Sequence, residues 1–165
     1  MSSADLKKFE ILFKSLRPSL VHFSIYITGS KHDANEIVND VFVSVWEKRK
    51  KLSLDESLKS YLFQAVKNRS INHQKKKRSI QVPLLDTDKQ SSYTADGSLL
   101  DNEQQQLLVS ILDSLPPKCR QVFVLSRMDH LSYSQIAGLM DISVKTVEAQ
   151  MSKALKIFRK KINRE

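Results

Sequence analysis

Three stretches of the chain carry side chains whose types and spacing fit binding chemistry. The first is the segment SVKTVEAQMSKAL, residues 143–155, where short polar and cationic residues share one side of an expected helix. Such side chains can donate and accept hydrogen bonds at base edges in the major groove of DNA. The residues on this side that we predict to contact DNA are Lys145, Thr146, Glu148, Ala149, Ser152 and Lys153.

This segment has the pattern of the second helix of a helix-turn-helix. Ser143 is a suitable N-cap, because its hydroxyl can accept a hydrogen bond from an amide that the helix leaves unpaired. Upstream, Ser132 and Gln135 have the spacing of a capping box for the first helix, and Asp141 stands where the turn needs a positive φ. An ordinary helical hairpin that binds nothing would share this pattern. The apolar residues expected on the inward side of the second helix are Val144, Val147, Met151, Ala154 and Leu155.

The second stretch is the basic segment YLFQAVKNRSINHQKKKR, residues 61–78, which we predict to lie in a helix from about residue 57 to 77. Cations interleaved with amides and aromatic rings suit a surface that follows phosphates and stacks on exposed bases. A solubilising charged helix, or an RNA-binding adaptor, would account for the same composition. The residues predicted to point outward and contact nucleic acid are Lys67, Asn68, Arg69, Lys75, Lys76, Lys77 and Arg78, with Tyr61 and Phe63 near the start.

The third stretch is a predicted helix over residues 31–48 with an apolar stripe from Ala34 to Trp46. Its opposite side is acidic and rich in amides, and Glu36 and Asp40 lie one turn apart. On a basic chain such a patch suits a basic protein partner better than DNA, although a merely solvated helix face has the same pattern. The residues that form the candidate patch are Asn35, Glu36, Asn39 and Asp40.

No residues in the sequence have the spacing of a catalytic or metal site. Glu36 and Asp40 could hold a metal in a nuclease, but two carboxylates without a third ligand make a weak site. The four His are scattered, no Gly-rich phosphate loop occurs, and the single Cys119 excludes an internal disulfide and a Cys-based zinc site. We therefore predict a binding protein that has no catalytic residue, metal, cofactor or small-molecule substrate.

The charge distribution supports an anionic partner. The formal net charge is +9 and the isoelectric point about 9.7, which predicts binding to nucleic acid or to a membrane surface. Both flanks of the chain are basic, and the middle is acidic. No apolar run has the length of a membrane span and the N-terminus lacks a signal-peptide core, so we expect a cytoplasmic protein.

We predict an all-α fold of two small helical domains joined by a flexible linker. Only three Gly and four Pro occur, which favours helices over β-turns. The first domain would span residues 1–78, with a helix over 5–29 that Pro18 kinks or divides and Gly29 closes. Residues 79–100 lose helical periodicity and would form the linker. The second domain, 101–165, would start at an Asp101 N-cap and contain a helix that begins at Pro116-Pro117.

Three motifs in this order resemble the extracytoplasmic-function (ECF, group 4) sigma factors, the minimal members of the sigma-70 family of RNA polymerase sigma factors. DANEIVNDVFVSVW is similar to the region 2 signature of that family, and YLFQAVKNRSINHQKKKR is similar to the segment that follows it. SLPPKCRQVFVLSRMDHLSYSQIAGLMDISVKTVEAQMSKALKIFR is similar to region 4. The resemblance covers nearly the whole chain except the linker.

The resemblance implies that the first domain binds core RNA polymerase and the promoter −10 element. The clamp helices of the largest polymerase subunit would be bound by Asn35, Glu36, Asn39 and Asp40. The loop after Trp46 and the helix that carries Asn68 would open the −10 element and capture a flipped base, while the basic residues of that helix hold the backbone.

The resemblance also implies that the second domain reads the promoter −35 element with its recognition helix. Many relatives have Arg at the position of Glu148, so a carboxylate here implies a different −35 preference. The implied partners are core RNA polymerase, promoter DNA and an anti-sigma factor, often membrane-anchored in this family. The alternative is a stand-alone helix-turn-helix regulator that binds an operator as a dimer, which would leave residues 31–78 without a role.

Overall fold

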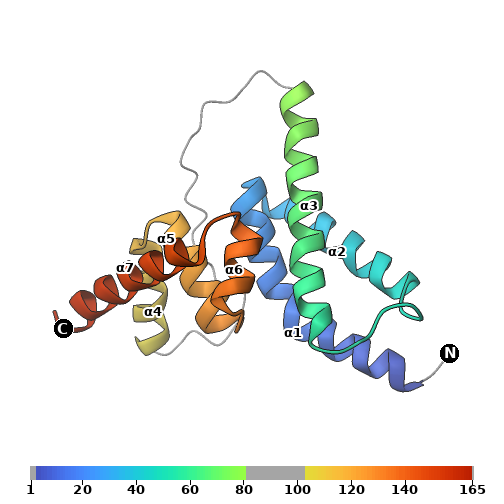
Figure 1. The fold of residues 1–165 in the computed structure, drawn as a ribbon, viewed down its shortest axis with the longest axis horizontal. Helices are drawn as coiled ribbons and strands as arrows, with labels where there is room; N and C mark the ends of the chain where they lie inside the picture. The colour runs from blue at the N-terminus through green and yellow to red at the C-terminus, as the bar shows by residue number, and fades with distance from the viewer. Residues whose placement is uncertain (1–2, 81–102, 165) are drawn as a thin grey trace. The chain divides into compact units, whose positions relative to one another are not determined.

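The computed structural model describes residues 3–80 and 103–164, and these residues are helical with no strand among them, which confirms the predicted all-α fold. The chain divides into two compact units, residues 1–91 and 92–165 (Figure 1). The predicted linker from residue 81 onward and the predicted Asp101 cap lie outside the described residues. None of the helices in the described ranges has the length and hydropathy to cross a bilayer.

The first unit consists of the helices α1 (Ser3–Thr28), α2 (Lys31–Glu47) and α3 (Ser57–Ile80). Pro18 lies inside one continuous α1, so this residue does not divide the helix. Gly29 ends α1 with a φ of 71°, a conformation that costs glycine little, and its N–H donates to the Ile25 carbonyl at 2.7 Å. Ser30 then caps α2 by accepting a hydrogen bond from the Asp33 amide at 3.2 Å.

Aromatic and aliphatic side chains from all three helices form the core of this unit. Phe9 of α1 contacts Trp46 of α2 with ring centroids 4.9 Å apart, and Phe13 contacts Phe42 at the same distance. The predicted apolar stripe of α2 is buried from Ala34 to Val45, and Trp46 is half-buried at its end. The core therefore uses one face of α2 and leaves the opposite face exposed.

Helix α3 is buried over a wider arc than its sequence pattern predicts, because it packs against both α1 and α2. Phe63 is 1% exposed and packs edge-on against Phe23, and Lys67 is 7% exposed. The prediction that Phe63 and Lys67 point outward is therefore wrong. On the same buried side the Ser24 and Ser70 hydroxyls form a hydrogen bond of 2.8 Å that joins α1 to α3.

The second unit consists of α4 (Glu103–Ser114), α5 (Pro117–Phe123), a π-helix η1 (Val124–Met128), α6 (Tyr133–Met140) and α7 (Val144–Ile162). As predicted, Pro117 is the first residue of α5, where its missing N–H costs no helical hydrogen bond. Cys119 is fully buried, and its thiol donates to the Gln150 carbonyl at 3.3 Å, which joins α5 to α7.

Helices α6 and α7 form the predicted helix-turn-helix. Both hydrogen bonds of the capping box are present, from the Gln135 amide to Ser132 Oγ and from the Ser132 amide to Gln135 Oε1. Asp141 has φ 55° and ψ 44°, the left-handed conformation predicted for the turn. The prediction that Val144 faces inward is wrong, because this residue is 42% exposed. Val144 is the first residue of α7, and the buried residues of this helix begin later, at Val147.

The left-handed turn at Asp141 leads to a stability prediction. Asp141→Gly and Asp141→Ala remove the same carboxylate, but alanine pays a steric cost at positive φ that glycine does not. We expect the Gly variant to be more stable than the Ala variant by about 1 kcal/mol, measured by urea unfolding.

Gly138, three residues earlier in α6, provides a control at which alanine should be more stable than glycine. A Cβ at this position meets no atom within 4 Å, and the backbone is helical. Gly138→Ala should therefore stabilise the protein by up to about 1 kcal/mol. Equal stability of the two Asp141 variants would show that the turn does not require the left-handed conformation.

Candidate protein and nucleic-acid interfaces

The exposed side of α2 forms a single stripe, which we call the acidic face. Its charged and amide groups come mostly from the predicted positions, and Glu36, Asn39 and Asp40 are all exposed. Val43 lies in the same stripe and is 57% exposed, although sequence reasoning did not assign it to the patch. Val43 does not belong to the apolar stripe of the helix, and this was the signal in the sequence that could have predicted its exposure. The residues of the acidic face are His32, Glu36, Asn39, Asp40, Val43 and Glu47.

An apolar side chain surrounded by carboxylates and amides is typical of a protein-binding surface, which has an apolar centre and a polar rim. Val43 has polar neighbours one turn away on both sides, the amide of Asn39 and the carboxylate of Asp40 before it and the carboxylate of Glu47 after it. The composition of the acidic face therefore favours a protein partner over a purely solvated helix.

Arg17 of α1 reaches the edge of the acidic face. Its Nη2 donates to Asn35 Oδ1 at 2.9 Å and to Asn39 Oδ1 at 3.3 Å. The guanidinium carbon also lies 5.9 Å from the ring centroid of Phe13. Asn35, which was predicted as a contact residue, is half-buried and donates through Nδ2 to the Lys31 carbonyl at 2.9 Å. Two of the predicted contact residues are thus tied to α1 by one arginine.

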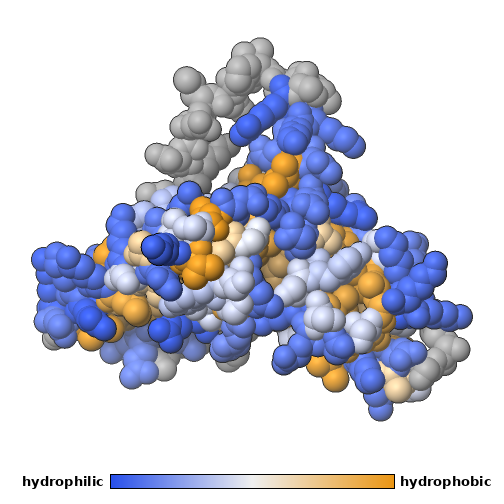
Figure 2. All heavy atoms as spheres, in the orientation of Figure 1, coloured by the Kyte–Doolittle hydropathy of each residue, from blue (hydrophilic) through white to orange (hydrophobic). Residues whose placement is uncertain are grey.

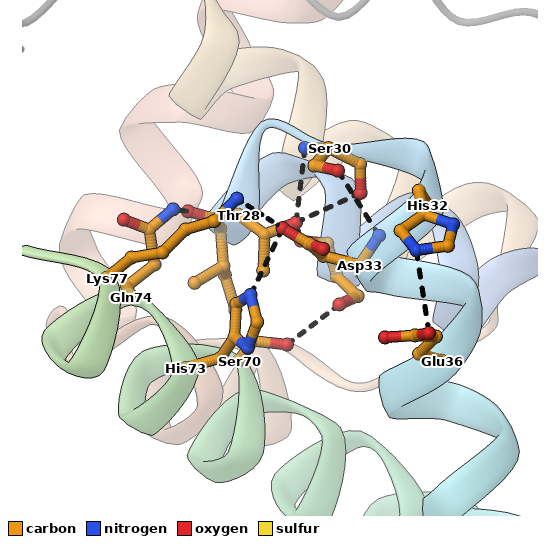
Figure 3. Close-up of polar contacts among 11 residues, drawn as sticks. Thr28, Ser30, His32, Asp33, Glu36, Ser70, His73, Gln74 and Lys77 are labelled. Carbon is orange, nitrogen blue, oxygen red and sulfur yellow. Dashed lines mark hydrogen bonds and ion pairs between the residues drawn. The ribbon is translucent and has the colours of Figure 1, made fainter. Parts of the chain in front are cut away.

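A network of polar contacts joins the start of α2 to the end of α3 (Figure 3). Lys77 Nζ lies 2.6 Å from Asp33 Oδ2, and His73 Nε2 lies 3.1 Å from the same oxygen. The Asp33 side chain is only 11% exposed, and Gln74 adds a hydrogen bond of 2.9 Å to the Ile27 carbonyl. The Lys77 ammonium, aided by His73, lowers the pKa of Asp33, although burial of the carboxylate acts in the opposite direction.

Asp33 also belongs to the one potential metal-ligand group found in the described residues, together with His32 and Glu36. Their ligand atoms lie within 4.8 Å of one another, so the structure groups Glu36 with His32 and Asp33, and Asp40, which the sequence suggested, is not part of the group. The Lys77 ammonium already neutralises the Asp33 carboxylate, and His32 pairs with Glu36 at 3.5 Å. We interpret the group as ion pairs within the protein.

The outward side of α3 carries part of the predicted nucleic-acid surface. Asn68, Arg69, Lys75, Lys76 and Arg78 are exposed, and hydrophilic residues cover the end of α3 in Figure 2. Lys67 is buried. Lys77 is half exposed, but its ammonium pairs with Asp33. The positive charge of these two residues was therefore not sufficient to predict that they contact nucleic acid.

Three further exposed residues lie on this outward side of α3. Tyr61 is 41% exposed, and Gln64 and Asn72 are exposed on the same side of the helix. Tyr61 was already named from the sequence, whereas Gln64 and Asn72 were not, and their spacing of four residues from Asn68 was the signal that could have identified them.

The loop between α2 and α3 is held by interactions at both ends. The Arg49 guanidinium lies 4.1 Å from the centroid of the Trp46 ring, and its Nη1 donates to the Trp46 carbonyl at 2.7 Å. Asp55 accepts hydrogen bonds from the Ser57 amide at 2.9 Å and the Ser53 hydroxyl at 2.6 Å. Next to this loop a groove of about 350 Å³ lies between α1 and the start of α3.

The outer side of α7 has the exposure that a recognition helix requires. Lys145, Glu148, Ala149, Ser152 and Lys153 are exposed, as predicted. Thr146 is half-buried, and its hydroxyl forms a hydrogen bond of 2.8 Å with Ser143 Oγ. Thr146 therefore contributes to the N-terminal cap of α7, and its hydroxyl is less available to a ligand than those of the other predicted residues.

Comparison with known families matches both units of the chain. Residues 12–80 match the family described as Sigma-70 region 2, and residues 105–157 match the family described as Sigma-70, region 4. The first match covers the acidic face and α3, and the second covers the helix-turn-helix.

Individual proteins show the same similarity along the whole chain. The chain is 25% identical to the ECF RNA polymerase sigma factor SigW of Bacillus subtilis, over 98% of this chain and 92% of that protein. It is 23% identical to the ECF RNA polymerase sigma-E factor of Escherichia coli, over 98% and 90%. Its fold resembles the sigma factor RpoE of Bartonella quintana, solved in complex with the anti-sigma factor NepR, with a TM-score of 0.62, 19% identity and coverage of 95% and 98%.

The contacts of Asp33 lead to a prediction about stability and pH. Asp33→Asn removes the charge that pairs with Lys77, and we expect it to destabilise the protein by about 1–2 kcal/mol at pH 7. Because the folded protein lowers the pKa of Asp33, this contribution is present above the ordinary carboxyl pKa of about 3.9 and is lost as the pH falls through the lower folded-state pKa.

Urea unfolding at pH 7 and at progressively lower pH would measure this difference. The stability gap between the parent and Asp33→Asn should shrink once the pH drops below about 3.9. Asp40→Asn, on the exposed side of the same helix, is the matched control and should change stability by less than about 0.5 kcal/mol. A gap that stayed constant with pH would exclude an ionised Asp33 as the cause.

Proposed function

This chain belongs to the ECF group of the sigma-70 family of RNA polymerase sigma factors, and from this we propose that it binds core RNA polymerase and directs it to promoters with particular −10 and −35 elements. The observation that carries the proposal is the separation of charge on a chain of net charge +9. One exposed helix face is acidic, while α3 and α7 expose cations and amides.

The acidic face of α2 is the proposed contact for the clamp helices of the polymerase. Glu36 and Asp40 are exposed one turn apart, and a basic partner would find complementary charge there. Val43, one turn after Asp40, would bury apolar area beside them. Such a face repels phosphates, so it is suited to binding a protein, and DNA would bind to other surfaces.

The outward side of α3 and the α2–α3 loop are the proposed −10 surface. Lys75, Lys76 and Arg78 would hold the backbone, and Asn68 and Arg69 would lie closer to the bases. A flipped base needs a pocket and a stacking partner. The exposed Tyr61 is a candidate for the stacking partner.

The exposed side of α7 is the proposed −35 surface. A helix-turn-helix places its second helix in the major groove with residues near the N-terminus on base edges. Lys145, Glu148 and Ser152 are exposed with this spacing, and the carboxylate of Glu148 can accept from the amino group of a cytosine. Cations further along α7 would contact the phosphate backbone.

We also propose that an anti-sigma factor regulates the protein by covering these surfaces. The sigma factor RpoE, which has a similar fold, was solved in complex with the anti-sigma factor NepR. A protein with an exposed apolar side chain on a binding face would be kept inactive by a partner that buries it.

Reconstituted transcription with core polymerase and a promoter library tests the proposal. Specific initiation should depend on addition of the protein, and Asp40→Lys should weaken core binding by about tenfold or more, because a like charge then meets the basic partner. Binding to −35 duplexes should remain unchanged. Lys14→Ala is a control with an altered surface charge on α1, where the exposed Lys14 pairs with Glu10.

Two results would contradict this assignment. A parent protein that never associates with core polymerase would refute the sigma-factor function itself. An Asp40→Lys protein that binds core as well as the parent would leave the function intact but place the polymerase contact elsewhere.

The recognition helix gives an independent prediction. Glu148→Arg replaces an acceptor with a bidentate donor suited to guanine, so the preferred −35 sequence should change by about 1–3 kcal/mol at one base pair. Selection from a randomised −35 library would measure the change, and core affinity should stay constant. Lys156→Ala, further along α7, should weaken all sequences equally. An unchanged base preference for Glu148→Arg would remove Glu148 from the reading surface.

A further inference from the structure

We propose that Arg17 is a positioning residue that sets the hydrogen-bonding polarity of the acidic face, so that Asn39 presents amide donors to the polymerase. This inference rests on the proposed function and adds to it a residue from α1, outside the motif that identifies the polymerase contact. Arg17 is separated in sequence from Asn35 and Asn39, and only the packing of α1 against α2 brings them together.

The orientation of the two amides follows from the chemistry of arginine. A guanidinium has only donors, so the groups that face it must be oxygens. Arg17 Nη2 donates to Asn35 Oδ1 at 2.9 Å and to Asn39 Oδ1 at 3.3 Å. The opposite orientation would set an amide N–H against a guanidinium N–H. Arg17 thereby decides which end of each side-chain amide points away from α1.

The two asparagines differ in what remains for a partner. Asn35 is half-buried, and its amide nitrogen donates to the Lys31 carbonyl, so both ends of its side chain are bound within the protein. Asn39 is exposed, and with its oxygen turned to Arg17 its two amide N–H groups point toward the exposed side. Asn35 therefore supports the arrangement, and Asn39 is the residue that meets the partner.

The arrangement of hydrogen-bond donors and acceptors on the acidic face predicts which groups the partner must present. Glu36 and Asp40 offer acceptors, and Asn39 next to them offers donors. The matching patch on the polymerase should carry cationic donors opposite the two carboxylates and a hydrogen-bond acceptor opposite Asn39. Arg17 would make this match available before binding, so less ordering is needed when the complex forms.

Charge and positioning predict effects of opposite sign when Arg17 is removed. The guanidinium weakens the negative field of the acidic face, so charge alone predicts tighter binding of Arg17→Ala to a basic partner, most of all at low salt. Loss of positioning predicts weaker binding at every salt concentration, because Asn39 can then present its oxygen or turn away. The direction of the change therefore separates the two explanations.

The experiment measures the affinity of the full-length protein for core RNA polymerase at two salt concentrations. We expect Arg17→Ala to bind about fivefold to tenfold more weakly than the parent, the effect of losing about one well-placed hydrogen bond. The matched control is Lys14→Ala, which removes one positive charge from α1 at an exposed site and should bind as well as the parent or more tightly. Equal or tighter binding of Arg17→Ala would overturn the proposal.

A double-mutant cycle with Asn39→Ala separates positioning from direct contact. If Arg17 acts through Asn39, the double variant should bind no more weakly than Asn39→Ala alone. Additive losses would mean that Arg17 touches the polymerase itself, and would overturn its role as a positioning residue. Urea unfolding and binding to −35 duplexes should match the parent in Arg17→Ala, and a parallel loss in either would indicate a general structural effect instead.

Asn39→Asp gives a second readout. Aspartate keeps an acceptor for Arg17 and adds negative charge, yet it presents an oxygen where the partner requires a donor. We expect weaker core binding despite the added negative charge, and tighter binding would contradict the proposed polarity. A parent protein that fails to bind core would refute the proposed function and this inference together, whereas a parent that binds and an Arg17→Ala that binds equally would refute the inference alone.

Discussion

The buried carboxylate of Asp33 is the interaction on which the arrangement of the first unit depends. It lies at the start of α2 and accepts a hydrogen bond from Lys77 near the end of α3, where His73 Nε2 lies 3.1 Å from the same oxygen. The acidic face and the cationic surface of α3 are on the two helices that this carboxylate joins, so it holds surfaces of opposite charge in a fixed relation. Gln74 and the Ser24–Ser70 pair tie the same part of α3 to α1. A partner that engages either surface therefore meets a pre-organised unit.

This arrangement explains how a strongly basic chain can expose an acidic surface. The exposed negative side chains of α2, Glu36, Asp40 and Glu47, lie on one stripe, opposite an apolar stripe that packs against α1 and α3. Two cations of α3 do not project from its outer surface toward a partner: the Lys77 ammonium pairs with Asp33, and Lys67 is buried. Arg17 approaches the edge of the acidic face and binds amide oxygens there, and His32 pairs with Glu36 at 3.5 Å. Negative and positive side chains thus lie on different helix faces as well as in different segments of the chain.

Periodicity and capping rules predicted most of the fold. The helix-turn-helix was predictable down to the capping box of Ser132 and the left-handed Asp141, because these depend on neighbours within a few residues. Lys67 and Phe63 were misplaced because their burial depends on two other helices that pack against α3. Arg17 was invisible for the same reason, since its partners lie on a different helix. Contacts set by tertiary packing carry no periodic signal in the sequence.

The environment of Cys119 has a practical consequence. The only thiol of the protein is fully buried and donates to a backbone carbonyl, and burial raises its pKa above the usual value despite the opposing charge of Lys153. A thiol of this kind is protected from alkylating reagents and peroxide, because the reactive thiolate is scarce and inaccessible. Cysteines added on the surface could therefore carry a pair of fluorophores without replacement of the native residue. Energy transfer between fluorophores on the two units would then report the distance between them with and without a binding partner.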